Sequence, residues 1–204
     1  MDKSDKIRLT EEYVKRAIKG YDSGHDWWHT DRVRRLALYI NEKENSCDPF
    51  EIELAALLHD IADSKFTGEN RNSRMEDVER FLSDNGMGEF TEMVSEVINN
   101  ISFSSRGKTG FTPTAVLGIV QDADMLDAIG AIGIARAFNY GGFRNNPIYD
   151  PSGQAKTTIS HFHDKLLKLK GLMNTETGKR LAADRHVFME SFLIRFHEEW
   201  DKQF

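Results

Sequence analysis

Residues 48–63 read DPFEIELAALLHDIAD, and this stretch decides the fold. Asp48 followed by Pro49 is a typical helix start, because aspartate caps the first turn and proline fits its first position. The residues that follow are apolar on most helix faces, so we expect a buried helix at the centre of a helical protein. The stretch ends in HDIAD, residues 59–63, where polar side chains follow directly on this buried segment.

The polar groups of HDIAD predict a metal site. Burying an imidazole and two carboxylates costs free energy unless a partner compensates, and a divalent cation is a strong partner. His59 and Asp63 share one helix face, and Asp60 lies about 100° round the helix from His59, close enough to reach the same ion. The alternative is a solvated helix end, where His59 would favour the helix dipole. We favour the metal site because the preceding LAALL is expected to be buried.

The rest of the chain is also patterned as helices. Only four prolines occur, and no alternating pattern indicates strands. Thr10 is expected to cap a first helix, and a second helix begins near residues 23–26. Gly130 and Gly133 lower helix stability, which predicts close packing against them. Further helices are expected over residues 74–85, 89–102, 114–140 (two helices or one bent one), 157–170 and 175–200. We therefore predict a single all-α domain, a helical bundle over residues 1–204.

Composition excludes several classes of protein. The net charge is −6 with acidic and basic residues intermixed, so no basic stripe suits a nucleic-acid polymer. Cys47 is the only cysteine, which excludes an internal disulfide framework and a multi-cysteine zinc site. No apolar run approaches the ~18–20 residues that span a bilayer, and the N-terminus has no apolar signal segment. We expect a cytoplasmic protein without membrane contact, as a monomer or homodimer.

A second acidic cluster lies in QDADMLDA, residues 121–128. Asp122, Asp124 and Asp127 are flanked by apolar runs on both sides. One of them facing solvent would be routine, but three within a buried segment suggest a chemical role. Asp124 and Asp127 are three residues apart and share a helix face, while Asp122 points elsewhere.

The stretch HDWWH, residues 25–29, offers a further ligand. Its two histidines are four residues apart, as in the H-E-x-x-H zinc-peptidase motif, with Asp26 in place of the glutamate. A zincin-like metallopeptidase using His25 and His29 would therefore be one interpretation. Aspartate is shorter by a methylene, and a peptidase would leave HDIAD and QDADML unexplained. The sequence then supplies His29 on one helix, HDIAD on a second and Asp124 on a third.

The order H…HD…D resembles the signature of the HD-domain metal-dependent phosphohydrolases. The stretches GHDWWHTDRV, LLHDIADSKF, QDADMLDAIGAIGIARAF and ISHFHDKLLKLKGLMNTETGKRLA are similar to one bacterial subgroup of stand-alone proteins of roughly 200 residues. The resemblance runs from about residue 20 to the C-terminus. It implies an HD-type bundle with a metal-site core at about residues 20–140 and C-terminal helices over residues 155–204 that pack on this core.

The resemblance implies that His29, His59, Asp60 and Asp124 bind a divalent metal ion. Mixed nitrogen and oxygen ligands suit Mn, Fe, Co, Ni, Zn or Mg, and two imidazoles favour a metal other than Mg. Such a site leaves positions for water and a phosphate oxygen. The ion would then offset phosphoryl charge and lower the pKa of its water from 15.7 toward about 7.

Further roles follow from the resemblance and from charge. Asp63 matches an acidic residue that HD nucleotidases use in proton transfer, and together with Asp60 it is a catalytic candidate; alternatively it orients a ligand histidine. Asp26 is expected to accept the free ring N–H of His29. Subgroup members often carry arginine at the position of Met125, so any substrate contact of that arginine is absent here. The candidates for substrate contacts are His25, Arg32, Lys65, Asp127 and Lys165, with Arg106 and Lys108 as further cations.

The resemblance implies a phosphohydrolase that acts on a nucleotide or a similar small phosphate compound. Cleavage would release phosphate or pyrophosphate, and we favour a nucleoside triphosphate pyrophosphohydrolase. One alternative is an HD module that binds metal or nucleotide without hydrolysis. Another is a metal-dependent oxygenase with two irons, for which His161 and His163 would supply additional ligands.

Overall fold

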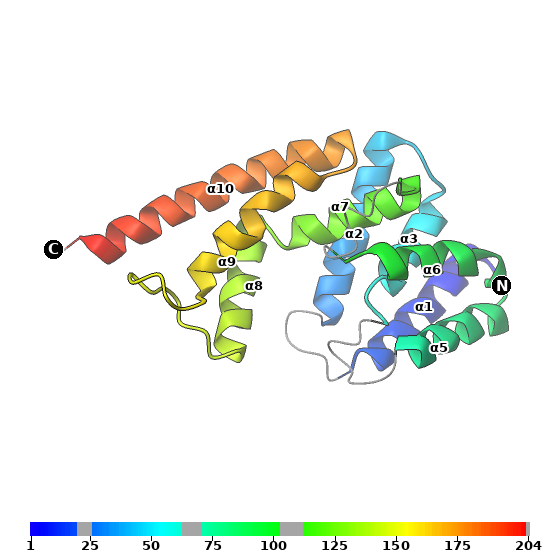
Figure 1. The fold of residues 1–204 in the computed structure, drawn as a ribbon. Helices are drawn as coiled ribbons and strands as arrows, with labels where there is room; N and C mark the ends of the chain where they lie inside the picture. The colour runs from blue at the N-terminus through cyan, green and yellow to red at the C-terminus, as the bar shows by residue number, and fades with distance from the viewer. Residues whose placement is uncertain (20–25, 63–70, 103–111, 203–204) are drawn as a thin grey trace. The chain divides into compact units, whose positions relative to one another are not determined.

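The computed structural model describes residues 1–19, 26–62, 71–102 and 112–202, and within these ranges all regular secondary structure is helical (Figure 1). This confirms the all-α prediction. The chain divides into two compact units, Met1–Ala123 and Asp124–Phe204. The extent of a single domain over residues 1–204 stays a prediction. None of the described helices is long and apolar enough to cross a membrane.

The first unit is built around the helix α3 (Pro49–Leu58). Its residues Ile52, Leu54, Ala55, Ala56, Leu57 and Leu58 are all at most 1% exposed. Helix α3 packs against the helices α1 (Lys3–Ala17), α2 (Trp27–Glu44) and α6 (Thr91–Asn100). The helix α5 (Arg71–Asp84) packs against α6 and the short 3₁₀ helix η1 (Gly88–Phe90). The central buried helix that the sequence predicts is therefore present.

The start of α3 is confirmed in detail, whereas the start of α1 is not. Asp48 accepts a hydrogen bond from the backbone N–H of Phe50, and Pro49 is the first helical residue. Helix α1, in contrast, begins at Lys3, with Asp2 as its cap. Thr10 is buried inside this helix, and its hydroxyl donates to the carbonyl of Lys6 at 2.9 Å. The prediction for Thr10 was wrong because the apolar face of α1 begins one turn earlier.

The second unit contains the end of α7 (Ala115–Asp127), then α8 (Gly130–Phe143), α9 (Thr158–Asp164), the 3₁₀ helix η3 (Leu166–Leu172) and α10 (Glu176–Asp201). Helix α10 packs on α8 and η3, and α9 packs on the same two elements. Rings of Phe138, Phe162 and Phe192 meet at the centre. The helix predicted over residues 157–170 is interrupted at Lys165, whose backbone leaves the helical region, and η3 follows.

The glycines at the start of α8 lie where backbone and side chains approach closely. Gly130 has φ of +74°, and an added Cβ would lie 3.0 Å from Cγ of Arg185. A Cβ on Gly133 would overlap the backbone carbonyl of Ala128. The close packing predicted for these two glycines is confirmed, and residues 114–140 form two helices rather than one bent helix.

Candidate metal centre

His59 follows the last residue of α3 and is 1% exposed. Its Nδ1 lies 2.7 Å from the backbone carbonyl oxygen of Ala56. A carbonyl oxygen only accepts hydrogen bonds, so Nδ1 carries a hydrogen, and in the neutral ring Nε2 then keeps its lone pair. The carbonyl thus fixes both the tautomer and the orientation of the ring, in the form that binds a metal ion through Nε2.

His29 lies in the first turn of α2 and is also 1% exposed. Asp26 caps this helix by accepting a hydrogen bond from the backbone N–H of His29 at 2.9 Å. The contact fixes where α2 begins and therefore where His29 is held. The centroids of the His29 and His59 rings are 5.4 Å apart. Asp26 thus supports His29 through its backbone; its predicted contact with the ring N–H stays a prediction.

Asp60 brings a carboxylate to both imidazoles. Its Oδ2 lies 3.3 Å from Nε2 of His29 and 3.4 Å from Nε2 of His59, and its side chain is 17% exposed. Burial acts to raise the pKa of the Asp60 carboxyl, but the His59 and His29 imidazoles oppose this and hold the pKa well below its ordinary value. Asp60 is therefore ionised, as a carboxylate ligand must be.

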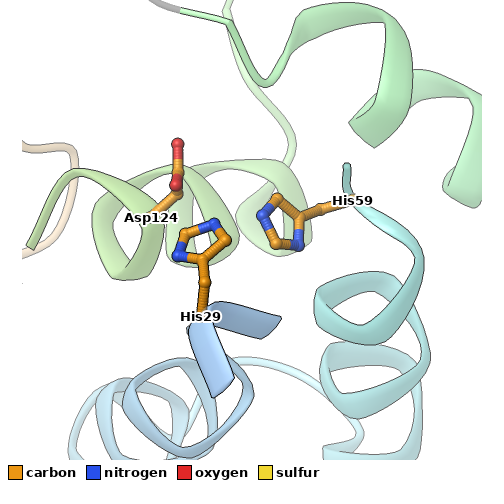
Figure 2. A group of neighbouring side chains, drawn as sticks. All are labelled: His29, His59 and Asp124. Atoms are coloured by element: carbon orange, nitrogen blue, oxygen red, sulfur yellow. The ribbon is translucent and has the colours of Figure 1, made fainter. Parts of the chain in front are cut away.

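Asp124 completes the group from α7. This helix begins in the first unit and continues without interruption through Asp124. His29, His59 and Asp124 each offer one ligand atom, and these three atoms lie within 4.8 Å of one another. Figure 2 shows the three side chains converging from three separate helical segments. The four residues that the sequence resemblance implies as ligands are thus near neighbours, although they span almost a hundred positions of the chain.

The donor set fits a divalent transition metal. Two imidazole nitrogens and two carboxylates are the mixture that Mn, Fe, Co, Ni and Zn accept, whereas Mg prefers oxygen alone. Neighbouring donors around an ion at about 2.1 Å lie roughly 3 Å apart. The separations of 3.3 and 3.4 Å between Asp60 and the two histidines are close to this spacing. A carboxylate oxygen held this near two imidazole nitrogens needs a cation or a proton between them, and a metal ion supplies that charge.

Other predicted site residues have varied surroundings. Arg32, on α2, and Lys165, at the end of α9, are both half-buried. Met125 is 7% exposed and belongs to the apolar core. Predictions for His25, Asp63, Lys65, Arg106 and Lys108 lie outside the described residues.

Asp127 has surroundings that favour a structural role over a substrate contact. Its side chain is only 2% exposed, and Oδ2 accepts from Nη1 of Arg136 at 2.6 Å. Arg136 is not among the residues predicted from the sequence, and neither is Arg185, whose guanidinium donates to the carbonyl of Leu126. A visible signal was Arg136 itself, a lone cation within the apolar run GAIGIARAF.

The two tryptophans before His29 have different environments. Trp27 packs against the core of the first unit, and Nζ of Lys15 lies 4.0 Å from its ring centroid. Trp28 is 63% exposed, although it is the residue immediately before the buried His29. Trp27 is therefore a packing residue of the first unit, whereas Trp28 offers a large open aromatic surface.

The helical fold and the H…HD…D group define an HD-type protein. The HD domain family matches residues 27–129, which include all four residues of the group, and the chain belongs to this family. It is 41% identical over 188 residues to the uncharacterized protein YpgQ of Bacillus subtilis, covering 92% of this chain and 90% of that protein.

Solved structures agree with this assignment. An HD-superfamily hydrolase from Bacillus thuringiensis superposes with a TM-score of 0.82 at 38% identity, covering 99% of this chain and 100% of that one. The structure of Bacillus subtilis YpgQ in complex with ADP superposes with a TM-score of 0.77 at 37% identity, covering 95% and 97%. The resemblance to stand-alone HD proteins of about 200 residues is thereby confirmed.

Proposed function

We propose that this protein is a divalent-metal-dependent phosphohydrolase whose substrate is a nucleotide or a similar small phosphate compound. The observation that carries the proposal is the placement of the Asp60 carboxylate within 3.4 Å of both buried imidazole nitrogens, with Asp124 beside them. The similar hydrolase from Bacillus thuringiensis supports the reaction class. The YpgQ complex with ADP supports a nucleotide ligand. A cytoplasmic location and a monomeric or homodimeric state stay predictions.

In this proposal His29, His59, Asp60 and Asp124 hold the metal ion, with manganese as our first choice. When bound, the ion would offset phosphate charge and lower the pKa of a bound water toward about 7. The carbonyl of Ala56 holds the hydrogen of the neutral His59 ring on Nδ1, which leaves the lone pair of Nε2 for the metal. Asp60 contributes a negative charge that its neighbours keep ionised. Asp63, three residues further on, is proposed to take the proton of the attacking water.

The proposal is tested with a panel of nucleotides and Mn²⁺, with phosphorus NMR as the readout. We expect turnover that stops when the metal is chelated, with pyrophosphate released from a nucleoside triphosphate. Release of inorganic phosphate instead would support a phosphohydrolase but show that it is not a pyrophosphohydrolase. If no phosphate compound is turned over with any of the six candidate metals, the enzyme proposal fails. Tight nucleotide binding without turnover would then favour the non-hydrolytic HD module.

Trp28 is proposed to stack on the base of the nucleotide, because it is exposed and adjacent to His29. Replacing Trp28 with alanine is expected to weaken nucleotide binding roughly 5- to 150-fold, which corresponds to the range that one base–aromatic stack is worth. Binding of inorganic tripolyphosphate, which has no base, should be unchanged. Trp28→Phe is the matched control and should retain most of the affinity. Equal losses for both ligands would show that Trp28 supports the fold instead.

A further inference from the structure

The last turn of α7 carries a carboxylate in an unfavourable place. Asp127 is the final residue of this helix and is 1% exposed. Burial disfavours an ionised carboxylate, and the negative end of the helix dipole disfavours it again. Asp127 is three residues after Asp124, so the two share one side of α7. Something must offset the cost of this charge, at a position one turn from a proposed metal ligand.

Two arginines from the second unit hold this turn. Arg136, on α8, binds Oδ2 of Asp127 at 2.6 Å, and its side chain is 19% exposed. Arg185, on α10, donates to the backbone carbonyl of Leu126, the residue before Asp127. A cation at this carbonyl also stabilises the helix end. The last turn of α7 is therefore bound through its side chain by one helix and through its backbone by another.

The position of Arg185 is itself tightly fixed. Its side-chain carbons occupy the space beside Gly130, where an added Cβ would lie 3.0 to 3.2 Å from them. Gly130 has a positive φ, which glycine adopts without strain. Burial lowers the pKa of the Arg185 guanidinium, and the charge of Asp127 is the first of the interactions that oppose this. The aliphatic part of Arg185 thus packs on a glycine while its guanidinium lies within the electrostatic reach of Asp127.

A buried ion pair is a poor way to gain stability, because apolar residues of similar size often do as well or better. In some proteins a buried ion pair instead fixes one defined orientation of the groups that it joins. A rotation of the last turn of α7 would move Asp124 together with Asp127. We propose that Arg136 and Arg185 are positioning residues that hold Asp124 in the orientation that binds the ion. This inference rests on the metal site proposed above.

The test measures metal binding rather than turnover. Arg136→Met and Arg185→Met are titrated with Co²⁺ by calorimetry at a temperature where both are folded, and the visible absorption of bound Co²⁺ is recorded. We expect each variant to bind Co²⁺ about 10- to 100-fold more weakly, the usual loss when a group that orients a metal ligand is removed. The absorption bands should shift, because Asp124 no longer approaches the ion in the same way. Arg136→Lys keeps a cation and should have an intermediate affinity.

Arg71→Met is the matched control. Arg71 also donates to a helix carbonyl, that of Ile98, but on helices that carry none of the four proposed ligands. The Arg71→Met substitution should lower the midpoint of thermal unfolding and leave the affinity for Co²⁺ and the absorption of bound Co²⁺ unchanged. If Arg136→Met and Arg185→Met behave in the same way, the positioning role is refuted. If a methionine variant does not fold, Arg136→Lys decides by the same criterion. Failure of the wild-type protein to bind Co²⁺ would instead refute the metal site itself.

Discussion

Asp60→Ala is expected to lower kcat/KM for the nucleotide substrate by about 10²- to 10³-fold or more, the scale on which a lost electrostatic contribution acts in a catalytic site. The reason is geometric, because the Asp60 carboxylate lies within 3.4 Å of the Nε2 atoms of both His29 and His59. Its removal takes away one of the proposed ligands and the negative charge between the other two. Metal content after dialysis should fall together with turnover.

The control for Asp60→Ala is the same substitution at Asp77, which lies on α5 and forms an exposed ion pair with Arg80. Exposed pairs of this kind are worth at most about 1 kcal/mol, so Asp77→Ala should retain activity and metal. Both proteins are compared by steady-state kinetics and by elemental analysis. If the Asp60→Ala protein has the metal content and turnover of the wild type, Asp60 is not a metal ligand.

Gly133→Ala is expected to have the largest effect on stability. The added methyl group would overlap the backbone carbonyl of Ala128, and backbone cannot move aside as a flexible side chain can. Overpacking of this kind costs about 1–3 kcal/mol, and occasionally more. In a protein of this size each kcal/mol lowers the midpoint of thermal unfolding by about 2–4 °C. We therefore expect a midpoint about 2–12 °C below that of the wild type.

Gly142→Ala, in the same helix, is the control for this substitution. Nothing lies within 4 Å of the position of its Cβ, and its φ is not positive. Alanine favours helix by up to about 1 kcal/mol relative to glycine, so this variant should be as stable as the wild type or slightly more stable. Calorimetry of both variants measures the difference. Equal midpoints for the two would contradict the close approach of Ala128 and Gly133.

The sequence was most informative where several signals coincided. Asp48 and Pro49 marked the start of α3, its apolar residues predicted burial, and the polar residues at its end predicted a metal site. The order of His29, His59, Asp60 and Asp124 then predicted which side chains would lie together. These signals are local or belong to a family pattern, so they can be read without knowing how the helices pack.

Features that depend on packing could not be predicted in this way. Thr10 is a good helix cap in isolation, but the apolar face of α1 extends before it and places it inside the helix. Lys165 lies in a helical pattern, yet the chain changes there to a 3₁₀ helix. The sequence predicts a substrate contact for Asp127, because nothing in it shows that Arg136, nine residues later, folds back onto this carboxylate.

The most direct measurement is a crystal structure of the protein grown with Mn²⁺, with data collected at the manganese absorption edge. We expect one strong anomalous peak, from an ion bound by Nε2 of His29, Nε2 of His59 and carboxylate oxygens of Asp60 and Asp124 at about 2.0–2.3 Å. A peak at a different place in the molecule, or a fully ordered site with no peak beside these side chains, would contradict it.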